Sequence, residues 1–478
     1  MIIPVVNPRT GLADCTIECL DEQEVAKIAR GMRAKQPDWA KRSHSDRATQ
    51  LIRMADAITR HQAVIVEALT RDTGRAALSV VEFDSVVRTF RRWANSAPAL
   101  IEGHQSQGRA TAIQSVTTAT HLIPYQLVGV ISPWNFPLTL ALIDAIPALA
   151  AGCAVLIKPS EVTPRFISPL RAAIAEVPEV EGVFEFIEGD AATGAALVDQ
   201  VDFIVFTGSV ATGRRVAEAA AHAFIPASLE LGGKDPLIVL ETANVDQAAK
   251  IVLRASVLNN GQACQSIERV YVARTIAPLF TQALVEKAKT VRLNYPDIHY
   301  GDIGPFILAR QADIVQRQID EAVANGARLL CGGTVETLGG GRYLRPTVLV
   351  DVTPDMAIMH EETFGPVIPV TVFDSEGEAI ELANRGEFGL SAAVIAGSIE
   401  EAEQIGLNLN VGAVSINDGS LTGLVWDVEK SSFGSSGIGP SRMGDSGLLR
   451  FLRHRLTIRQ AGHALTLSAY AEDSPHLS

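Results

Sequence analysis

Apolar residues in the first part of the chain recur at the spacing of an amphipathic helix. Between residues 27 and 69, Leu51, Met54 and Ile58 follow this spacing among residues that favour helices. From residue 101 to residue 125 the composition changes to Ser, Thr, Gln and Gly, with small apolar residues in alternation. Because such alternation is typical of exposed strands, we expect a strand or hairpin that leaves the main body.

Short apolar runs then alternate with helical stretches through the middle of the chain. The helical stretches begin near residues 138, 165, 191 and 210, so the order is strand, helix, strand. This order predicts a mostly parallel sheet with helices on both faces. Ligands bind such sheets beyond the carboxyl ends of the strands. The predicted strands are residues 127–131, 154–157, 183–187, 203–206 and 227–231, and the ligand-facing loops are 132–137, 158–161 and 207–213.

A second series of elements begins after Gly232 and Gly233. It contains a strand at 237–240, a long helix from 245 to about 259, and a strand at 269–273, which together predict a second domain. Two regions rich in Gly, residues 331–341 and 417–439, are interpreted as loops. The polar end of the chain from Ala471 is expected to be loosely held.

Composition narrows the class of protein. The chain has 478 residues, 47% of them hydrophobic, which indicates more than one packed core. Its formal net charge of −13 opposes binding to nucleic acid or to anionic lipid. Residues 138–157 have the length of a membrane span, but Asp144, Pro147 and Gly152 interrupt them, so we expect no membrane insertion. The five cysteines lack metal-binding spacing, and no export signal is legible, so a reducing, cytoplasmic location is expected and no metal.

Three residues could carry chemistry, each with a simpler alternative. Cys264 follows a helix in a Gly-containing loop, where its sulfur could face a cleft as a nucleophile or be a small buried hydrophobe. Glu230 ends a strand beside glycines. It could act there as a general base, or it could be only a solvated surface carboxylate. Asn135 lies between two prolines, where its amide could donate to an oxyanion or only form a turn.

Two loops after predicted strands could bind a nucleotide. Gly208, Ser209 and Gly213 open a helix, whose N–H groups could face a pyrophosphate. Arg214 stands where a P-loop carries Lys, which excludes a nucleoside triphosphatase of that type. The loop 158–161 offers an ammonium and a carboxylate to sugar hydroxyls, although charged residues after a strand are often only solvated.

In this order, these features resemble the aldehyde dehydrogenase superfamily over nearly the whole chain. The resemblance implies an α/β fold with an open, parallel-sheet (Rossmann-like) nucleotide-binding domain, an α/β catalytic domain and a small β oligomerisation segment. The expected bounds are 1–105 with 125–232, then 233–442, and finally 106–124 with 443–478. The matching blocks are Pro133–Pro137 (PWNFP), Lys158–Glu161 (KPSE), Phe206–Ser209 (FTGS), Glu230–Lys234 (ELGGK), Gly261–Cys264 (GQAC) and Glu361–Pro366 (EETFGP).

The resemblance also implies roles for individual residues. Cys264 is expected to be the nucleophile, Asn135 and the Cys264 N–H the oxyanion hole, and Glu230 the base that activates water. The carboxylate of Glu161 favours the free ribose of NAD over the phosphate of NADP, although NADP is possible. The positions that match cofactor contacts are Ile131, Ser132, Pro133, Trp134, Lys158, Ser160, Glu161, Gly208, Ser209, Gly213, Leu231, Glu362 and Phe364.

Substrate and assembly are expected from the same resemblance. Apolar residues at the tunnel positions favour an uncharged aliphatic or aromatic aldehyde, unless they only pack the helix. These positions are Phe136, Leu140, Ile143, Leu258, Trp426 and Phe433. A homodimer or homotetramer is expected. The alternatives are a CoA-acylating semialdehyde dehydrogenase, which typically lacks a glutamate at the position of Glu230, and a non-catalytic member of the fold.

Overall fold

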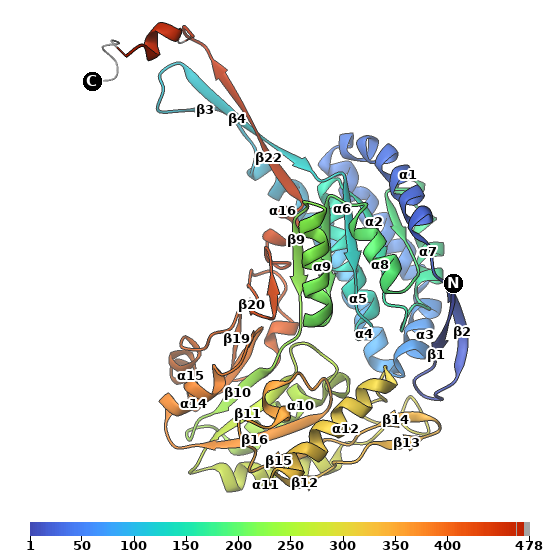
Figure 1. Cartoon of the computed structure of the whole chain (residues 1–478), viewed down its shortest axis with the longest axis vertical. Coiled ribbons are helices and arrows are strands. Elements are labelled where there is room, and N and C mark those ends of the chain that lie inside the picture. The colour runs from blue at the N-terminus through green and yellow to red at the C-terminus, as the bar shows by residue number, and fades with distance from the viewer. Residues whose placement is uncertain (465, 473–478) are drawn as a thin grey trace.

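The computed structural model, which describes residues 1–464 and 466–472, contains two α/β lobes and a long β arm (Figure 1). Each lobe is built on its own mostly parallel sheet. The fold class is therefore the α/β class that the sequence predicts. Within the described residues, no helix combines the length and apolar character that a membrane crossing requires.

The first lobe has a six-stranded sheet in the order β21-β9-β8-β5-β6-β7, in which only β21 is antiparallel. Helices cover both faces of this sheet, so its core strands are buried on both sides. Strands buried in this way have continuous apolar sequences, as these do. The strands are β5 (Leu127–Ile131), β6 (Ala154–Lys158), β7 (Phe184–Phe186), β8 (Phe203–Thr207), β9 (Ala227–Glu230) and β21 (Gly437–Ile438). The helices are α1 (Glu22–Lys41), α2 (His44–Arg60), α3 (Gln62–Thr73), α4 (Ala76–Gly103), α5 (Pro137–Leu142), α6 (Ala145–Ala151), α7 (Ile167–Ile174), η1 (Pro178–Val180), α8 (Ala191–Val198), α9 (Val210–His222) and α16 (Ser446–Leu449).

The second lobe has a seven-stranded sheet in the order β12-β15-β16-β11-β10-β18-β19, in which only β12 is antiparallel. Separate apolar clusters cover its two faces. The strands are β10 (Asp235–Val239), β11 (Ile267–Ala273), β12 (Arg328–Cys331), β15 (Thr347–Val350), β16 (Val367–Phe373), β18 (Ala392–Ile395) and β19 (Val414–Ile416). The helices are α10 (Val245–Val257), η2 (Leu258–Gly261), α11 (Ala277–Thr290), α12 (Ala309–Ala324), α13 (Ala357–His360), α14 (Glu376–Ala383), α15 (Ile399–Gly406) and η3 (Leu421–Gly423).

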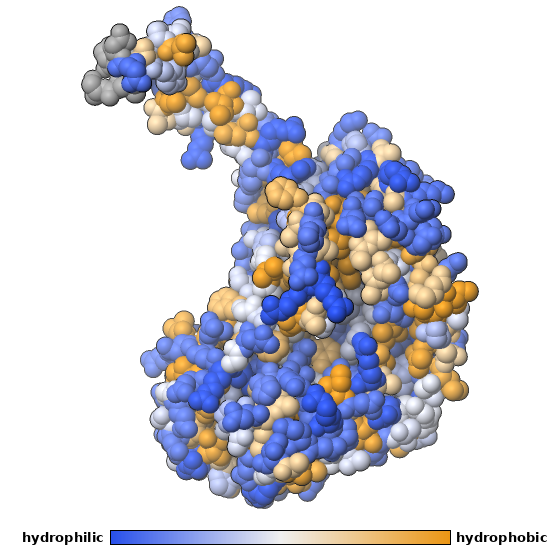
Figure 2. All heavy atoms as spheres, in the orientation of Figure 1, coloured by the Kyte–Doolittle hydropathy of each residue, from blue (hydrophilic) through white to orange (hydrophobic). Residues whose placement is uncertain are grey.

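The arm is a three-stranded antiparallel sheet that leaves the first lobe (Figure 1). It contains β3 (Ser106–Ala110), β4 (Val116–Pro124) and β22 (Leu452–Gln460), followed by η4 (Leu467–Tyr470). The predicted polar excursion is therefore a hairpin, and the end of the chain pairs with it. Leu456 and Ile458 on β22 are 56% and 65% exposed, and Figure 2 shows apolar side chains gathered along the arm.

The structure corrects several details of the sequence interpretation. An N-terminal hairpin, β1 (Ile2–Val6) with β2 (Ala13–Glu18), precedes the first helix and was not predicted. The regions 331–341 and 417–439 are not only loops. Short strands lie there: β13 (Glu336–Leu338) pairs with β14 (Gly341–Tyr343), and β20 (Phe433–Gly434) pairs with β17 (Phe388–Gly389). Most of the segment after Ala471 lies outside the described residues.

The strand β21 belongs to the sheet of the first lobe, although it follows the strands of the second lobe in the sequence. It lies within the range 233–442, which was assigned to the catalytic part, but it pairs with β9 at the edge of the first sheet. Gly437 is opposite Glu230, and Ile438 is opposite Leu229. Because β9 ends at Glu230, this pairing brings the C-terminal segment directly to one of the candidate catalytic residues.

Candidate active site

Cys264 lies in a turn between η2 and β11, after three consecutive residues with positive φ. Asn259 and Asn260 have φ of 56° and 57°, a region that residues other than Gly seldom adopt, and Gly261 has φ of 70°. A Cβ added at Gly261 would lie 2.2 Å from the carbonyl oxygen of Gly365. The glycine therefore lets the turn pack directly on the EETFGP segment, and this packing fixes the half-buried Cys264 in place.

Asn135 is held against this turn by a buried network of amides. Its Nδ2 donates to the carbonyl oxygen of Gln262 over 3.0 Å. Asn259 Nδ2 donates to the carbonyl oxygens of both Asn135 (3.1 Å) and Gln262 (2.9 Å). An Asn amide carries two N–H donors, so Asn135 keeps one beyond this bond. The Cys264 N–H donates to no backbone carbonyl in the part of the chain that the structure describes.

Glu230 is half-buried at the end of β9, close to the same turn. Its Oε2 accepts a hydrogen bond of 3.1 Å from Ser432 Oγ. Its carbonyl oxygen accepts one of 3.1 Å from the Gly208 N–H. A Cβ added at Gly233 would lie 2.4 Å from the carbonyl oxygen of Cys264, so only glycine allows this approach. The structure thus brings Glu230, Asn135 and Cys264 into one site.

The electrostatic surroundings of Cys264 are unfavourable to a thiolate. Burial raises the pKa of the Cys264 thiol to about 12. The carboxyl groups of Asp235, Glu362 and Glu230 act in the same direction, whereas Lys430 lowers the pKa. The burial of the Cys264 thiol and the carboxyl groups near it therefore favour its neutral form.

A buried ion pair that sequence reasoning missed supports the EETFGP segment. Lys234 Nζ donates to Glu268 Oε2 over 2.7 Å and to Thr363 Oγ1 over 2.8 Å. Glu268 also accepts from the backbone N–H groups of Thr363 and Phe364, over 2.8 and 2.7 Å. Burial lowers the pKa of Lys234. The sequence signal for this pair is Glu268, which stands beside Arg269 in a strand whose other residues are apolar or aromatic.

Two predicted cofactor residues lie on that segment. Burial, followed by the charge of Glu268, raises the pKa of Glu362 to about 8, and its Oε1 accepts a hydrogen bond of 3.1 Å from the Gly233 N–H. Phe364 has φ of 54° and packs edge-on against Trp134, with ring centroids 5.4 Å apart. The structure therefore joins the EETFGP segment to the PWNFP loop beside Cys264.

Most of the other predicted cofactor residues follow the carboxyl ends of β5, β6 and β8, and Leu231 follows β9. Lys158 Nζ is 3.1 Å from Glu161 Oε2. Ser132 Oγ is buried and has no hydrogen-bond partner among the described residues. Ser209 caps α9, with its Oγ accepting from the Thr212 N–H, and a Cβ at Gly213 would lie 2.4 Å from Leu231 Cδ2. Ile131, Pro133, Ser160 and Gly208 lie in the same three loops or at the strand ends that begin them.

These residues fit a dinucleotide. The N-terminus of α9 suits a pyrophosphate because its N–H groups point outward with the positive end of the helix dipole. The ammonium of Lys158, the carboxylate of Glu161 and the orphaned hydroxyl of Ser132 offer hydrogen bonds to sugar and phosphate oxygens.

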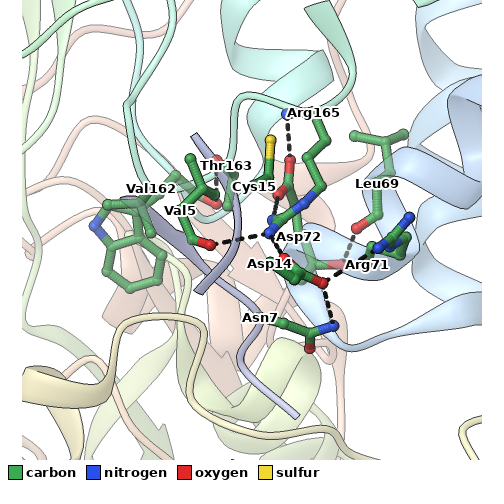
Figure 3. A network of polar contacts seen from close by, with 12 residues as sticks. Val5, Asn7, Asp14, Cys15, Leu69, Arg71, Asp72, Val162, Thr163 and Arg165 are labelled. Carbon is green, nitrogen blue, oxygen red and sulfur yellow. Dashed lines mark hydrogen bonds and ion pairs between the residues drawn. The ribbon is translucent and has the colours of Figure 1, made fainter. Parts of the chain in front are cut away.

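An ion network around Arg165 connects the loop that carries Lys158 and Glu161 to α3 and to the N-terminal hairpin (Figure 3). Arg165, seven residues after Lys158, pairs with buried Asp72 of α3 and with Asp14 of β2. Its backbone N–H also donates to Asp72 Oδ2 over 2.8 Å, and its guanidinium donates to the carbonyl oxygen of Val5 over 3.2 Å. The unpredicted N-terminal hairpin is therefore locked to the loop through this arginine.

The expected tunnel residues are only partly brought together. Ile143 and Trp426 line a small hollow with Thr139 of α5 and with residues of α4. Phe136 lies under the guanidinium of Arg75, which is 4.5 Å from the ring centroid. Leu140 is buried, whereas Leu258 and Phe433 are 45% and 39% exposed, and none of these three lines the hollow.

Comparison with known proteins identifies the family of the chain. The family model described as "Aldehyde dehydrogenase family" matches residues 1–457. The chain belongs to the aldehyde dehydrogenase family.

Relatives of this aldehyde dehydrogenase differ in their named substrates and cofactors. A Mycolicibacterium smegmatis protein provisionally named succinate-semialdehyde dehydrogenase [NADP(+)] is 36% identical over 453 residues, which are 94% of this chain and 87% of that protein. The provisionally named aldehyde dehydrogenase PutA from Anabaena variabilis has a TM-score of 0.95 and 47% identity, over 98% of this chain and 99% of its own.

One solved relative carries a cofactor. Betaine aldehyde dehydrogenase from Staphylococcus aureus, in complex with NAD+, has a TM-score of 0.90 and 28% identity, over 97% of this chain and 93% of its own. The aldehyde dehydrogenase described here is thus an oxidoreductase that oxidises aldehydes to acids with NAD or NADP.

Proposed function

We propose that Cys264 is the nucleophile of this enzyme, that Asn135 and the Cys264 N–H form the oxyanion hole, and that Glu230 is the base for hydrolysis. The observation that carries this proposal is the convergence of the three residues. The amide of Asn135 bonds to the turn that bears Cys264, and Gly233, three residues after Glu230, packs on the carbonyl of Cys264.

The proposed reaction proceeds through a thioester on Cys264. The thiolate of Cys264 forms a bond to the aldehyde carbon, and the carbonyl electrons move onto oxygen, where the two N–H donors stabilise the charge. The C–H electron pair leaves as hydride, for which bound NAD is the acceptor, and a thioester on Cys264 results. Glu230 then takes a proton from water as the water oxygen attacks the thioester carbon. The C–S bond breaks, the thiolate re-forms and the carboxylic acid leaves.

Water is the proposed acyl acceptor, rather than CoA. Glu230 is half-buried beside Cys264 and is oriented by Ser432, so a carboxylate is present where hydrolysis requires a base. Turnover without CoA, followed as NADH absorbance with a pool of aliphatic and aromatic aldehydes, tests this choice. An absolute requirement for CoA would replace hydrolysis by the acylating reaction.

NAD is the proposed preferred cofactor. The Glu161 carboxylate is close to Lys158, and it favours free ribose hydroxyls over a phosphate because two negative groups repel each other. Lys158 offsets part of this repulsion, so NADP is a slower alternative. The proposed contacts are those of the loops that follow β5, β6 and β8, with Leu231, which packs on Gly213 of α9, and with Glu362 and Phe364 of the EETFGP segment.

The substrate is proposed to be an uncharged aliphatic or aromatic aldehyde. Ile143 and Trp426 support this proposal, because they present apolar surface to the hollow beside α5. Phe136 and Leu140 belong to the same loop and helix, and Leu258 and Phe433 are proposed to meet larger substrates at the mouth.

We also propose a separate function for each part of the chain. Residues 1–105 and 125–232 would bind NAD, residues 233–442 would carry catalysis, and residues 106–124 with 443–478 would mediate assembly. Exposed Leu456 and Ile458 on an edge strand support a homodimer or homotetramer, since such strands pair readily with a second chain. A cytoplasmic location is proposed from the unpaired cysteines of the described residues.

A further inference from the structure

A buried ion pair at the start of α4 contacts the PWNFP loop and has no part in the proposed reaction. Arg75 Nη2 donates to Glu82 Oε2 over 3.0 Å, and the two side chains are 6% and 1% exposed. Burying an ion pair removes two charges from water, so such a pair is weak evidence for stability by itself. Its contacts with the loop indicate a different role.

Glu82 caps the helix that follows the loop. Helix α5 begins at Pro137, which has no N–H, and Phe136 before it supplies no side-chain cap. The first N–H groups of α5 therefore belong to Leu138 and Thr139. Both donate to the same oxygen, Glu82 Oε1, over 2.8 and 2.9 Å. A carboxylate from another helix thus takes the place of the missing N-cap side chain, at the helix end that favours negative charge.

Arg75 contacts the residue between Asn135 and α5. Its guanidinium carbon lies 4.5 Å from the ring centroid of Phe136. Its Nε and Nη1 have no hydrogen-bond partner among the described residues, so the Glu82 carboxylate and the Phe136 ring balance the buried cation. The ion pair therefore holds both the aromatic ring before α5 and the N–H groups at its start.

Asn135 is consequently fixed from two directions. Its side-chain amide donates to the carbonyl oxygen of Gln262 in the turn that bears Cys264, whereas its backbone continues through Phe136 into the capped start of α5. The first contact holds one amide hydrogen, and the second sets the position of the loop along the α5 axis. The position of the remaining amide hydrogen, which is the proposed donor to the oxyanion, depends on both.

We propose that Glu82 and Arg75 are positioning residues for the oxyanion hole. They form no bond to the reacting atoms. They hold the backbone of Asn135 where its free N–H meets the negative charge that develops on the aldehyde oxygen. A displaced loop weakens this hydrogen bond steeply, because the bond depends on distance and angle and acts best when it is aligned in advance. This role rests on the oxyanion hole of the proposed function.

The test compares two reagents that react with the same sulfur. An aliphatic trifluoromethyl ketone adds to Cys264: the C–S bond forms, the carbonyl electrons move onto oxygen, and the thiol proton goes to solvent. Iodoacetamide alkylates Cys264 with loss of iodide and forms no oxyanion, so only the ketone reports on the oxyanion hole. Fluorine NMR of the free and bound ketone gives its Kd, and mass spectrometry of the Cys264 peptide gives the alkylation rate. Neither measurement requires turnover.

Glu82→Leu combined with Arg75→Met removes both charges at similar volume, so that no unpaired charge remains buried. The Kd of the ketone should rise about tenfold, whereas the alkylation rate should stay within about twofold of the wild type. Glu82→Gln combined with Arg75→Met is the matched variant. Its amide oxygen can still accept from Leu138 and Thr139, so it should recover most of the affinity.

A milder variant serves if the leucine variant does not fold. Glu82→Asp keeps the negative charge but withdraws the carboxylate by one methylene, and it should raise the Kd of the ketone about threefold. Asp56→Asn combined with Arg91→Gln is the control for the helix, because Arg91 of α4 forms an exposed ion pair with Asp56. Both reagents should then behave as they do with the wild type.

Asn135→Ala shows whether the pair acts through Asn135. Loss of this donor should raise the Kd of the ketone about 100-fold. The Glu82 and Arg75 substitutions should add nothing further in that background, because the group that they position is gone.

Three results would overturn the proposal. The first is an unchanged Kd in the leucine variant or, where that variant does not fold, in Glu82→Asp. The second is an equal loss with both reagents, which would mean that the whole site is distorted. The third is an additive loss in the Asn135→Ala background. If Asn135→Ala itself left the Kd unchanged, the proposed oxyanion hole would fail instead, so the two failures are distinguishable.

Discussion

Ser432 and Glu230 are 202 positions apart in the chain, and the hydroxyl of the first donates a hydrogen bond of 3.1 Å to the carboxylate of the second. The bond fixes one carboxylate oxygen, and the other oxygen has no hydrogen-bond partner among the described residues. Because Ser432 comes from the segment that precedes β21, the orientation of the proposed base depends on the C-terminal part of the chain.

Glu230→Gln should slow hydrolysis of the thioester about 100-fold or more, because an amide cannot take a proton from water. Formation of the thioester should be affected far less, so stopped-flow absorbance should show a burst of NADH before a slow steady state. Glu387→Gln is the control, since Glu387 also accepts from a serine of this segment, Ser435, but is exposed. A steady state unchanged in Glu230→Gln would refute its role as base.

Cys264→Ala should abolish NADH formation while NAD still binds, because the sulfur forms the covalent intermediate. Quenching of tryptophan fluorescence by NAD measures the binding, since Trp134 lies in the proposed cofactor loop. Cys331→Ala should retain full activity, because Cys331 is on β12, the edge strand of the second sheet. Turnover that survives in Cys264→Ala would exclude this residue as nucleophile.

Glu161→Gln should reduce the ratio of kcat/KM for NAD to that for NADP about tenfold, because one charge repulsion with the phosphate is removed. Steady-state kinetics with both cofactors measures the ratio. Glu176→Gln, which removes a carboxylate paired with Arg60 on the surface, should leave the ratio unchanged. If Glu161→Gln also left it unchanged, the carboxylate would not discriminate between the two cofactors.

Asp72 should make stability fall as pH rises. Burial raises its pKa to about 7 in the folded protein, although Arg165 opposes this effect. The unfolded chain releases the proton near pH 3.9, so between about pH 4 and about pH 7 the folded state binds more protons and loses stability with increasing pH.

Thermal unfolding as a function of pH tests this sign. Asp72→Asn keeps an acceptor for the Arg165 N–H and should show a flatter decrease of Tm over that window. Asp246 is the comparison with the opposite sign, because hydrogen bonds from Lys250 and Lys287 lower its pKa to about 2. Asp246→Asn should change the slope of Tm against pH only below about pH 4. Equal slopes in the wild type and in Asp72→Asn would contradict the assignment.

Leu456→Asp combined with Ile458→Asp should convert the enzyme to a species of the single-chain mass, 51.0 kDa. The two side chains are exposed on β22, and their burial between chains would be prevented by charge. Light scattering after size-exclusion chromatography measures the mass. Leu407→Asp, an exposed leucine at the end of α15, is the control and should not change the assembly. An unaltered mass in the double variant would remove the arm as the interface.

The sheet of the first lobe could be predicted closely from the sequence. Residues 127–131 match β5 because strands buried on both faces read as continuous apolar runs. The β1–β2 hairpin was missed because Pro4 interrupts its apolar run, although Asn7 and Gly11 form the turn that joins the two strands.

The candidate site was predicted less completely than the sheets. Cys264, Glu230 and Asn135 stand in recognisable motifs, but their mutual arrangement depends on long-range contacts. Asn259, which holds Asn135, lies 124 positions from it, and Thr363 lies 129 positions from Lys234.

The pairing of β21 with β9 also constrains how this protein is made. The ribosome completes β9 about two hundred residues before it adds β21, so β9 waits as an open strand edge during most of synthesis. A chain that stops before Gly437 leaves this edge exposed permanently and also has no β22 to pair with β4. We therefore expect truncated forms of this enzyme to aggregate, even when both large sheets are otherwise present.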